Sequence, residues 1–193
     1  MTTREEALRA AFGEGELHAP DDPDLAINWP DGGVMVFPPR GDRRGWHYVT
    51  HGLSDTFDYE IAMSTPKRCE WPTMMLFEMA KYLLLDDEAA AILPGDRMPT
   101  GAFAKVAPGT RLSHIFATTS TEYACAFAIV HLVGATPSEI ERAKKEGGAF
   151  GTKVLCETLR RLGVGFVTDP ARSSTTDAPS FDDVWRQCAL AIA

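Results

Sequence analysis

Residues 46–63 read WHYVTHGLSDTFDYEIAM, and this stretch decides the fold. Over Phe57–Met63 the large apolar side chains fall on every second residue, a period that predicts a strand with one buried face. Trp46–Leu53 predicts a second strand, and Ser54–Thr56 between them predicts a tight turn. We therefore expect an antiparallel hairpin at this point of the chain.

Further strands are predicted on both sides of this hairpin. Val34–Phe37 ends at two prolines, which cannot continue inside a hydrogen-bonded ladder. Leu112–Ala117 and Tyr123–Val133 are later strands, and the second is apolar without alternation, as expected for a strand covered on both faces. Val164–Thr168 is expected to be a last short strand.

The clearest helix signal is Trp71–Leu85. Pro72 suits the first turn, where a missing N–H has no cost. Because the segment is apolar nearly all round, we expect a central helix packed on several sides. Its methionines, with Met75 and Met79 on one face, are typical of core filling and are also compatible with an adaptable binding groove.

The N-terminal region predicts one helix and a long connection. Thr3–Phe12 has the pattern of a short helix, with Thr3 as its cap and two acids in the first turn. Residues 13–33 are rich in Asp, Pro and Gly, so we expect an acidic connection with little regular structure there.

The C-terminal third predicts three helices. Thr136–Glu139 forms a capping box that begins the first of them. Gly147 and Gly148 interrupt this helix, and a second helix runs to Leu162. After a Ser/Thr-rich linker, Phe181–Ala193 is predicted to form a terminal helix.

These elements predict an α+β fold: a single domain with a central mixed, mainly antiparallel sheet flanked by helices on both faces. We divide the chain into residues 1–32 (the N-terminal helix and acidic connection), 33–173 (the main domain) and 174–193 (the linker and C-terminal helix).

The net charge narrows the class of partner. The net charge is −8 and the pI about 5.1, so nucleic acid and anionic membranes are poor partners, whereas a basic protein would be attracted. Many cytoplasmic proteins are equally acidic without a basic partner.

The four cysteines form no C-x-x-C pair, and the sequence shows neither a signal peptide nor a segment long enough to span a bilayer. We expect a cytoplasmic protein.

Catalytic and metal-binding patterns are weak. His47 and His51 lie in a predicted strand, where four residues span about 13 Å, too far for one metal ion. A nucleophile set of Cys125, His131 and Asp169 is one alternative, but Cys125 belongs to the most apolar segment, where burial raises the pKa of a thiol. The sequence has no P-loop and no G-x-S-x-G motif, and we expect no cofactor.

Eight segments, in order, resemble the suppressor of fused (SUFU) family. They begin with Trp46–Asp55 and Phe57–Ile61, and the match covers about residues 33–173. The remaining six are Trp71-Pro72 with Ala80-Lys81-Tyr82, Pro94-Gly95-Asp96, the strand with His114, Phe127–Gly134, Ser138-Glu139-Ile140 and Val167–Arg172.

The resemblance implies a mixed α/β sheet domain with a non-enzymatic role. Animal members of the family are cytoplasmic inhibitors that bind Gli transcription factors, and short bacterial members look like immunity proteins that neutralise partner toxins. This chain has the length of the first domain alone, so we expect no second lobe and no Gli binding. Its Ala- and Arg-rich composition and short loops resemble those of bacterial members.

We therefore predict a protein-binding domain whose partner is another protein, with a basic toxin as one candidate. A small Cys/His-dependent enzyme and a homo-oligomeric scaffold are the alternatives. The partner's identity, the oligomeric state and the binding face stay open. The candidate surface positions for binding are Trp46, His47, Asp55, Glu60, Asp96, Asp169 and Arg172.

Overall fold

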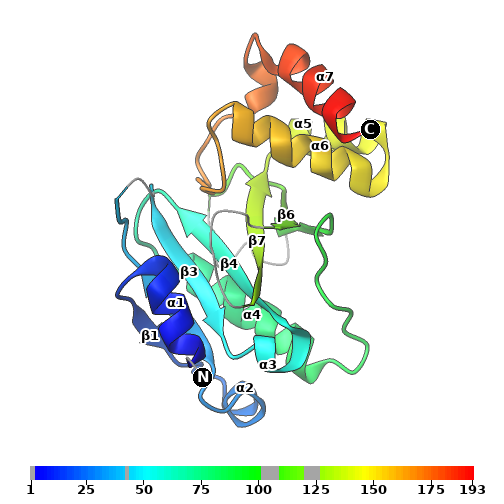
Figure 1. Cartoon of the computed structure of the whole chain (residues 1–193). Helices are drawn as coiled ribbons and strands as arrows, with labels where there is room; N and C mark the ends of the chain where they lie inside the picture. Colours follow the sequence, from blue (N-terminus) through cyan, green and yellow to red (C-terminus); the bar gives the residue numbers. More distant parts are fainter. Residues whose placement is uncertain (1–2, 42–43, 101–108, 120–126) are drawn as a thin grey trace. The chain divides into compact units, whose positions relative to one another are not determined.

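The computed structural model describes residues 3–41, 44–100, 109–119 and 127–193 (Figure 1). Within these residues, seven strands form one open, mixed sheet in the order β1-β2-β3-β4-β7-β6-β5, which confirms the predicted α+β class. The strands are β1 (Glu16–His18), β2 (Gly33–Phe37), β3 (Trp46–His51), β4 (Tyr59–Thr65), β5 (Arg97–Pro99), β6 (His114–Thr119) and β7 (Ala128–Ala135).

The chain packs as two compact units. The first comprises residues 1–92 and 119–131, and the second comprises residues 93–118 and 132–193. Helices α1 (Arg4–Phe12), α2 (Pro23–Asn28), α3 (Ser54–Phe57) and α4 (Trp71–Leu85) belong to the first unit. The second contains α5 (Pro137–Glu146), α6 (Gly148–Arg161), a short 3₁₀ helix (Thr175–Asp177) and α7 (Phe181–Ile192).

In the first unit, helix α1 covers one face of the sheet. Phe12 stacks on Phe37 with 5.0 Å between ring centroids, and Leu8 packs into the same buried cluster as Met35 and Val49. Burial of each such side chain contributes about 1.5–3 kcal/mol. Thr3 caps the helix as predicted, because its hydroxyl accepts a hydrogen bond from the N–H of Glu6.

Helix α4 covers the opposite face of the same strands. The strand register places Val36 opposite Tyr48, and both lie on the face away from Phe37, because side chains alternate along each strand. Met75 and Met79 are buried and α4 packs against β2, β3 and β4, so these two methionines fill the core. The prediction of helices on both faces is confirmed (Figure 1).

Three helices build the second unit. Helices α5, α6 and α7 pack together around a core that includes Leu155, Leu159 and Trp185. Helix α6 approaches α5 closely at Gly151, where a Cβ atom would overlap the carbonyl oxygen of Ala143. Among the described residues no helix is long and apolar enough to span a membrane.

The N-terminal connection is more regular than predicted. Instead of an irregular segment, it contains β1 and α2. The Asp22 carboxylate accepts hydrogen bonds from the N–H groups of Asp24 and Leu25, at 3.0 and 3.1 Å, and Pro23 occupies the first turn. An acidic, proline-containing stretch thus acts here as a helix cap.

The hairpin is confirmed, with two corrections. Strands β3 and β4 pair antiparallel, but residues 54–57 form the one-turn helix α3 rather than a tight turn. Strand β4 is buried along its whole length, so the prediction of one buried face is wrong. The alternation of side chains is real, but α1 covers the face that the pattern assigned to solvent.

The last predicted strand is absent from the described structure. Residues 164–168 contain only an isolated bridge at Val167. The Thr168 hydroxyl accepts a hydrogen bond from the N–H of Gly134 at 3.0 Å, so a side chain rather than a strand ladder holds this segment. Of the predicted strand Tyr123–Val133, residues 123–126 lie outside the described residues, and β7 continues to Ala135.

Candidate protein-binding surface

The first two predicted positions open strand β3. Trp46 is half-buried, and the guanidinium carbon of Arg68 lies 5.3 Å from the centroid of its ring. His47 is only 4% exposed, its Nδ1 atom is 2.8 Å from the Ser64 hydroxyl, and its ring packs against Phe12. The predicted surface position is therefore wrong for His47, because α1 covers this face of the strand.

Glu60 is also misplaced by the sequence prediction. Its side chain is fully buried, and its two carboxylate oxygens accept five hydrogen bonds. The donors are the N–H groups of Gly52, Leu53 and Ser54 and the hydroxyls of Thr50 and Ser54. Glu60 thus fixes the turn from β3 into α3 instead of facing a partner.

Three predicted acids keep access to solvent. Asp55 is exposed and pairs with Arg4. Asp96 is exposed and accepts a hydrogen bond from the N–H of Leu93 at 2.7 Å. Asp169 is half-buried and accepts one from the N–H of Ala171 at 2.9 Å. Their role in binding stays a prediction.

Arg172 is engaged inside the second unit. Its guanidinium donates to both carboxylate oxygens of Glu139 at 2.6 Å and to the carbonyl of Gly134 at 2.8 Å. Burial alone would raise the pKa of Glu139, but the hydrogen bonds and charge of Arg172 outweigh it and hold that pKa below its usual value. Arg172 is 10% exposed, so this contact is chiefly structural.

The structure does not bring the alternative catalytic residues Cys125, His131 and Asp169 together within its described part. Cys125 lies outside the described residues, and His131 is fully buried in β7. Cys156, a half-buried thiol in α6, has a pKa raised by burial. In the described part of the chain, no three His, Cys, Asp or Glu side chains form a group that could hold a metal ion.

The first unit contains a groove whose lining residues the sequence did not single out. This groove of about 790 Å³ runs between the first turns of α4 and the β1 edge of the sheet. Val36 and Tyr48 line it from the sheet, and Met74 and Phe77 line it from α4. The signal available in the sequence was the group of methionines in α4. In the structure Met74 is 49% exposed, whereas Met75 and Met79 are core residues.

Polar groups fix the walls of this groove. The Tyr48 hydroxyl accepts a hydrogen bond from the N–H of Cys69 at 2.9 Å, and burial raises the pKa of this phenol, so it stays neutral. Arg68 donates to Glu16 at 2.6 Å and thereby links the loop before α4 to strand β1. Outside the groove lining, Lys81 of α4 pairs with Asp22.

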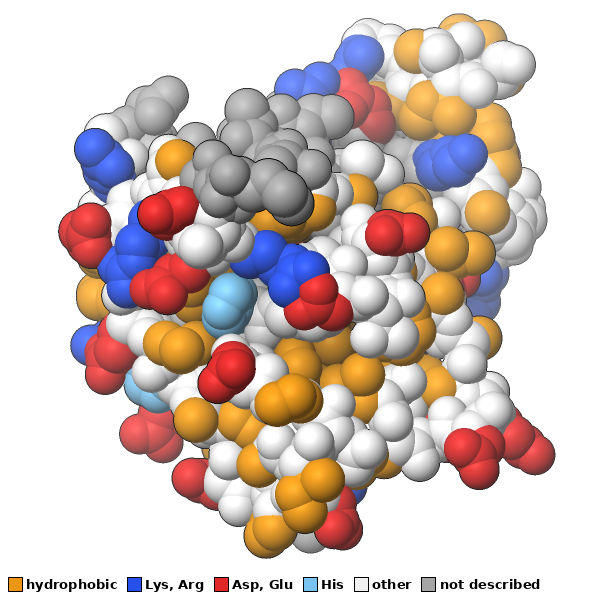
Figure 2. Space-filling model, turned by 60° about the horizontal axis from the view of Figure 1, so that its bottom comes forward, with side chains coloured by type: hydrophobic (Ala, Val, Ile, Leu, Met, Phe, Trp, Pro, Cys, Tyr) orange, Lys and Arg blue, Asp and Glu red, His pale blue; other side chains and the backbone are white. Residues whose placement is uncertain are grey.

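The negative charge is concentrated in the first unit. Its residues include 18 acids and 8 bases, a formal charge of −10, whereas the second unit has 9 acids and 11 bases, a formal charge of +2. On the face turned forward in Figure 2, acidic and basic side chains are interspersed with hydrophobic ones. The first unit is thus acidic overall, and its exposed apolar residues include Leu17, Ile27 and Met74.

The sequence profile of the family "Suppressor of fused protein (SUFU)" matches residues 29–173, three quarters of the chain. The chain belongs to the SUFU family. No curated protein matches this SUFU chain in sequence.

Solved structures show the same fold. A SUFU homologue from Neisseria gonorrhoeae superposes with a TM-score of 0.68 at 14% identity, over 89% of this chain and 93% of that one. A chain from the crystal structure of the Sufu–Fu complex superposes with a TM-score of 0.66 at 14% identity, over 97% of this chain and 94% of that one. Drosophila Suppressor of Fused gives 0.52 at 14% identity over 83% of this SUFU chain, which spans 45% of that protein.

Proposed function

We propose that this SUFU chain is a non-enzymatic domain that binds another protein, and that its partner is basic. The observation that carries the proposal is membership of a family in which a relative of the same fold has been crystallised in complex with another protein, Fu. A fold does not by itself specify a function, so the surface chemistry must support the same conclusion.

The charge distribution supports a basic partner. A formal charge of −10 on the first unit attracts a positively charged protein and speeds association at low salt. A toxin that acts on nucleic acid has a basic active site, and an acidic domain that covers such a site neutralises it. We therefore propose an immunity role.

We also propose that the chain acts in the cytoplasm. Cys69, Cys156 and Cys188 are free thiols, which is the state expected in a reducing compartment.

A pull-down from the native organism tests this function. The tagged chain should recover one stoichiometric basic partner, identified by mass spectrometry. The affinity of the purified pair should fall when the salt concentration is raised from about 50 to about 200 mM, because salt screens the attraction between the two charged surfaces. If the partner is a toxin, an equimolar amount of the chain should abolish its activity. A chain that only self-associates in sedimentation and recovers no partner would favour the homo-oligomeric scaffold.

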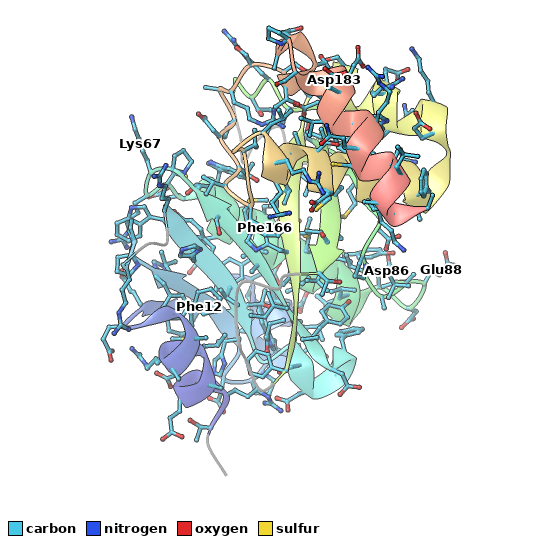
Figure 3. The ribbon with its side chains drawn as sticks, turned by 45° about the horizontal axis from the view of Figure 1, so that its top comes forward. Phe12, Lys67, Asp86, Glu88, Phe166 and Asp183 are labelled. Carbon is cyan, nitrogen blue, oxygen red and sulfur yellow. The ribbon has the colours of Figure 1, made fainter. Side chains whose placement is uncertain are left out.

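Charge reversal then tests two of the predicted positions. Asp96→Lys and Asp169→Lys should each weaken binding if they face the partner. An unchanged affinity removes that position from the candidate surface. Asp183→Lys is the matched control, because Asp183 is an exposed acid on α7 (Figure 3) that the sequence did not single out.

A further inference from the structure

Strand β1 has one side without a neighbouring strand in the described structure. It pairs antiparallel with β2 and is the last strand of the sheet on its side. Leu17 is 43% exposed, and both ends of the strand are at least partly accessible. An exposed strand edge presents backbone N–H and C=O groups that can pair with a strand from another chain.

The edge and the groove share one face of the sheet. The register places Glu16 opposite Val36 and His18 opposite Val34, so Glu16 and His18 lie on the α4 side of the strand. His18 itself lines the groove. A peptide that extends the sheet next to β1 would therefore direct every second side chain to the groove side.

The groove is a suitable receptor for such side chains. Its volume of about 790 Å³ lies in the range of ligand pockets, and Met74 and Phe77 supply an apolar wall. Methionine is a flexible side chain that adapts to different apolar groups. The groove thus favours apolar side chains at alternate positions of an extended segment.

Charge selects the class of occupant. Asp21 and Glu70 line the groove and are exposed, and neither forms an ion pair within the described residues. Two basic side chains also line the groove, and both lie beside the same acid: Arg68 pairs with Glu16 at 2.6 Å, and His18 Nε2 is 3.7 Å from a Glu16 carboxylate oxygen. The groove therefore has two carboxylates available for cations, within a unit of formal charge −10.

We propose that this groove binds an extended basic segment of the partner protein, which adds to the sheet as a strand beside β1. Its apolar side chains pack against Met74 and Phe77, and its Lys or Arg side chains meet Asp21 and Glu70. The proposal rests on the proposed function, since it names the site and the chemistry of the same partner.

A peptide selection tests the groove without a known partner. A display library of random 12-residue peptides is selected against the folded chain, and enriched peptides should combine apolar residues with Lys or Arg. A bound peptide should slow hydrogen exchange at the amides of Glu16–His18. It should also slow alkylation of Cys69, which lines the groove and is measured by peptide mapping.

Matched lysine variants locate the site. Met74→Lys should weaken peptide binding at least about tenfold, because it places a cation against the basic peptide and removes the apolar wall. Ile27→Lys is the control, since Ile27 is an apolar residue 75% exposed on α2 that does not line the groove. It makes the same change in net charge and should leave binding within about twofold.

Neutral variants test the carboxylates. Asp21→Asn with Glu70→Gln should weaken binding about tenfold at low salt and reduce its salt dependence. The matched control is Asp86→Asn with Glu88→Gln, because both acids are exposed in the segment after α4 (Figure 3) and neither lines the groove. Circular dichroism and thermal unfolding establish that all variants are folded.

The outcomes separate this inference from the proposed function. A library that yields no binders, binders without basic residues, or equal binding to Met74→Lys would overturn the groove proposal. If basic peptides bind the groove but the organism contains no partner, the groove stands and the proposed function fails. If a cellular partner binds the Met74→Lys variant as tightly as the wild type, the proposed function is retained and the groove is rejected as the binding site.

Discussion

Arg172 donates two hydrogen bonds of 2.6 Å to the two carboxylate oxygens of Glu139, which lies 33 residues earlier in the chain. Glu139 also accepts from the N–H of Thr136 at 2.8 Å, as a capping box requires, and from the N–H and hydroxyl of Thr175. One carboxylate thus joins the start of α5, Arg172 and the 3₁₀ helix. Because Glu139 is fully buried, its charge depends on this pairing.

Replacement of Arg172 should destabilise the second unit. Arg172→Met keeps the length of the aliphatic stem but leaves the Glu139 carboxylate buried without its cation, so the free energy of unfolding should fall by about 3 kcal/mol. Urea unfolding at pH 7, followed by circular dichroism, measures the change.

A double variant separates the lost pair from lost packing. Glu139→Gln with Arg172→Met removes both charges and should recover part of the stability lost in Arg172→Met alone. Arg186→Met is the control, because Arg186 forms an exposed pair with Asp183 and should cost less than about 1 kcal/mol. A double variant no more stable than Arg172→Met would contradict the assigned role of the pair.

Glu60 gives a second test of a structural role. One carboxylate oxygen accepts three hydrogen bonds and the other accepts two, so glutamine in either orientation would direct an NH₂ donor at two or more donors. Glu60→Gln should therefore lower the free energy of unfolding by about 2–3 kcal/mol. Differential scanning calorimetry measures the shift in Tm.

The exposed Glu88 provides the matched control for Glu60. Glu88→Gln should change stability by less than about 0.5 kcal/mol. If Glu60→Gln instead keeps native stability and loses partner binding, the sequence-based prediction of a binding role would be restored.

Local signals predicted the elements that local chemistry decides. Helix α4 begins and ends where Pro72 and the apolar run indicate, and the capping box at Thr136 marks the start of α5. The prediction failed where a distant contact decides. Residues 164–168 form no strand, and their described contact with β7 is the hydrogen bond between Thr168 and Gly134. Helix α2 was missed for a different reason: its cap, Asp22, is a local signal that the acidic, proline-containing composition obscured.

The candidate site was harder to predict because contacts distant in the sequence form it. Alternation in β4 cannot show that α1 packs over Ala62, or that the turn after β3 and Thr50 enclose the Glu60 carboxylate. The groove combines residues from His18 to Phe77, which only the folded sheet brings together. No short segment of the sequence indicates a partner, because the acids of the first unit are spread over the whole unit.

The close approach of α5 and α6 predicts a strong effect of one methyl group. Gly151→Ala would place a Cβ atom against the carbonyl oxygen of Ala143, which is backbone and cannot rotate away. Although alanine favours helix, overpacking at this contact should lower the free energy of unfolding by about 1–3 kcal/mol.

Thermal unfolding followed by circular dichroism measures the effect of Gly151→Ala. Lys153→Ala is the control on the same helix, because Lys153 is exposed and its loss should leave stability within about 0.5 kcal/mol. A Gly151→Ala variant more stable than the wild type would show that the two helices can move apart at no cost.

Glu157 makes stability depend on pH in the acid range. Hydrogen bonds from Arg160 at 2.7 and 2.8 Å, and from Arg161 at 2.8 Å, hold the pKa of its carboxyl at about 2, against a usual value of 4.5. Because the folded pKa is the lower one, the stabilisation is complete above about pH 4.5 and is lost as the pH falls towards 2.

Glu157→Gln should therefore cost most at neutral pH. Both arginines lie on the helix surface, where solvent screens the pair, so we expect a loss of about 1 kcal/mol at pH 7. Urea unfolding of the variant and the wild type is measured at about pH 7, 4, 3 and 2, which covers the range between the two pKa values. The difference in the free energy of unfolding should shrink to nearly zero as the pH falls. The exposed Glu141, paired with Lys144 at 3.2 Å, serves as control, and Glu141→Gln should cost less than about 0.5 kcal/mol at pH 7. A Glu157→Gln difference that stays constant from pH 7 to 2 would mean that the contribution of this side chain comes from packing rather than from its charge.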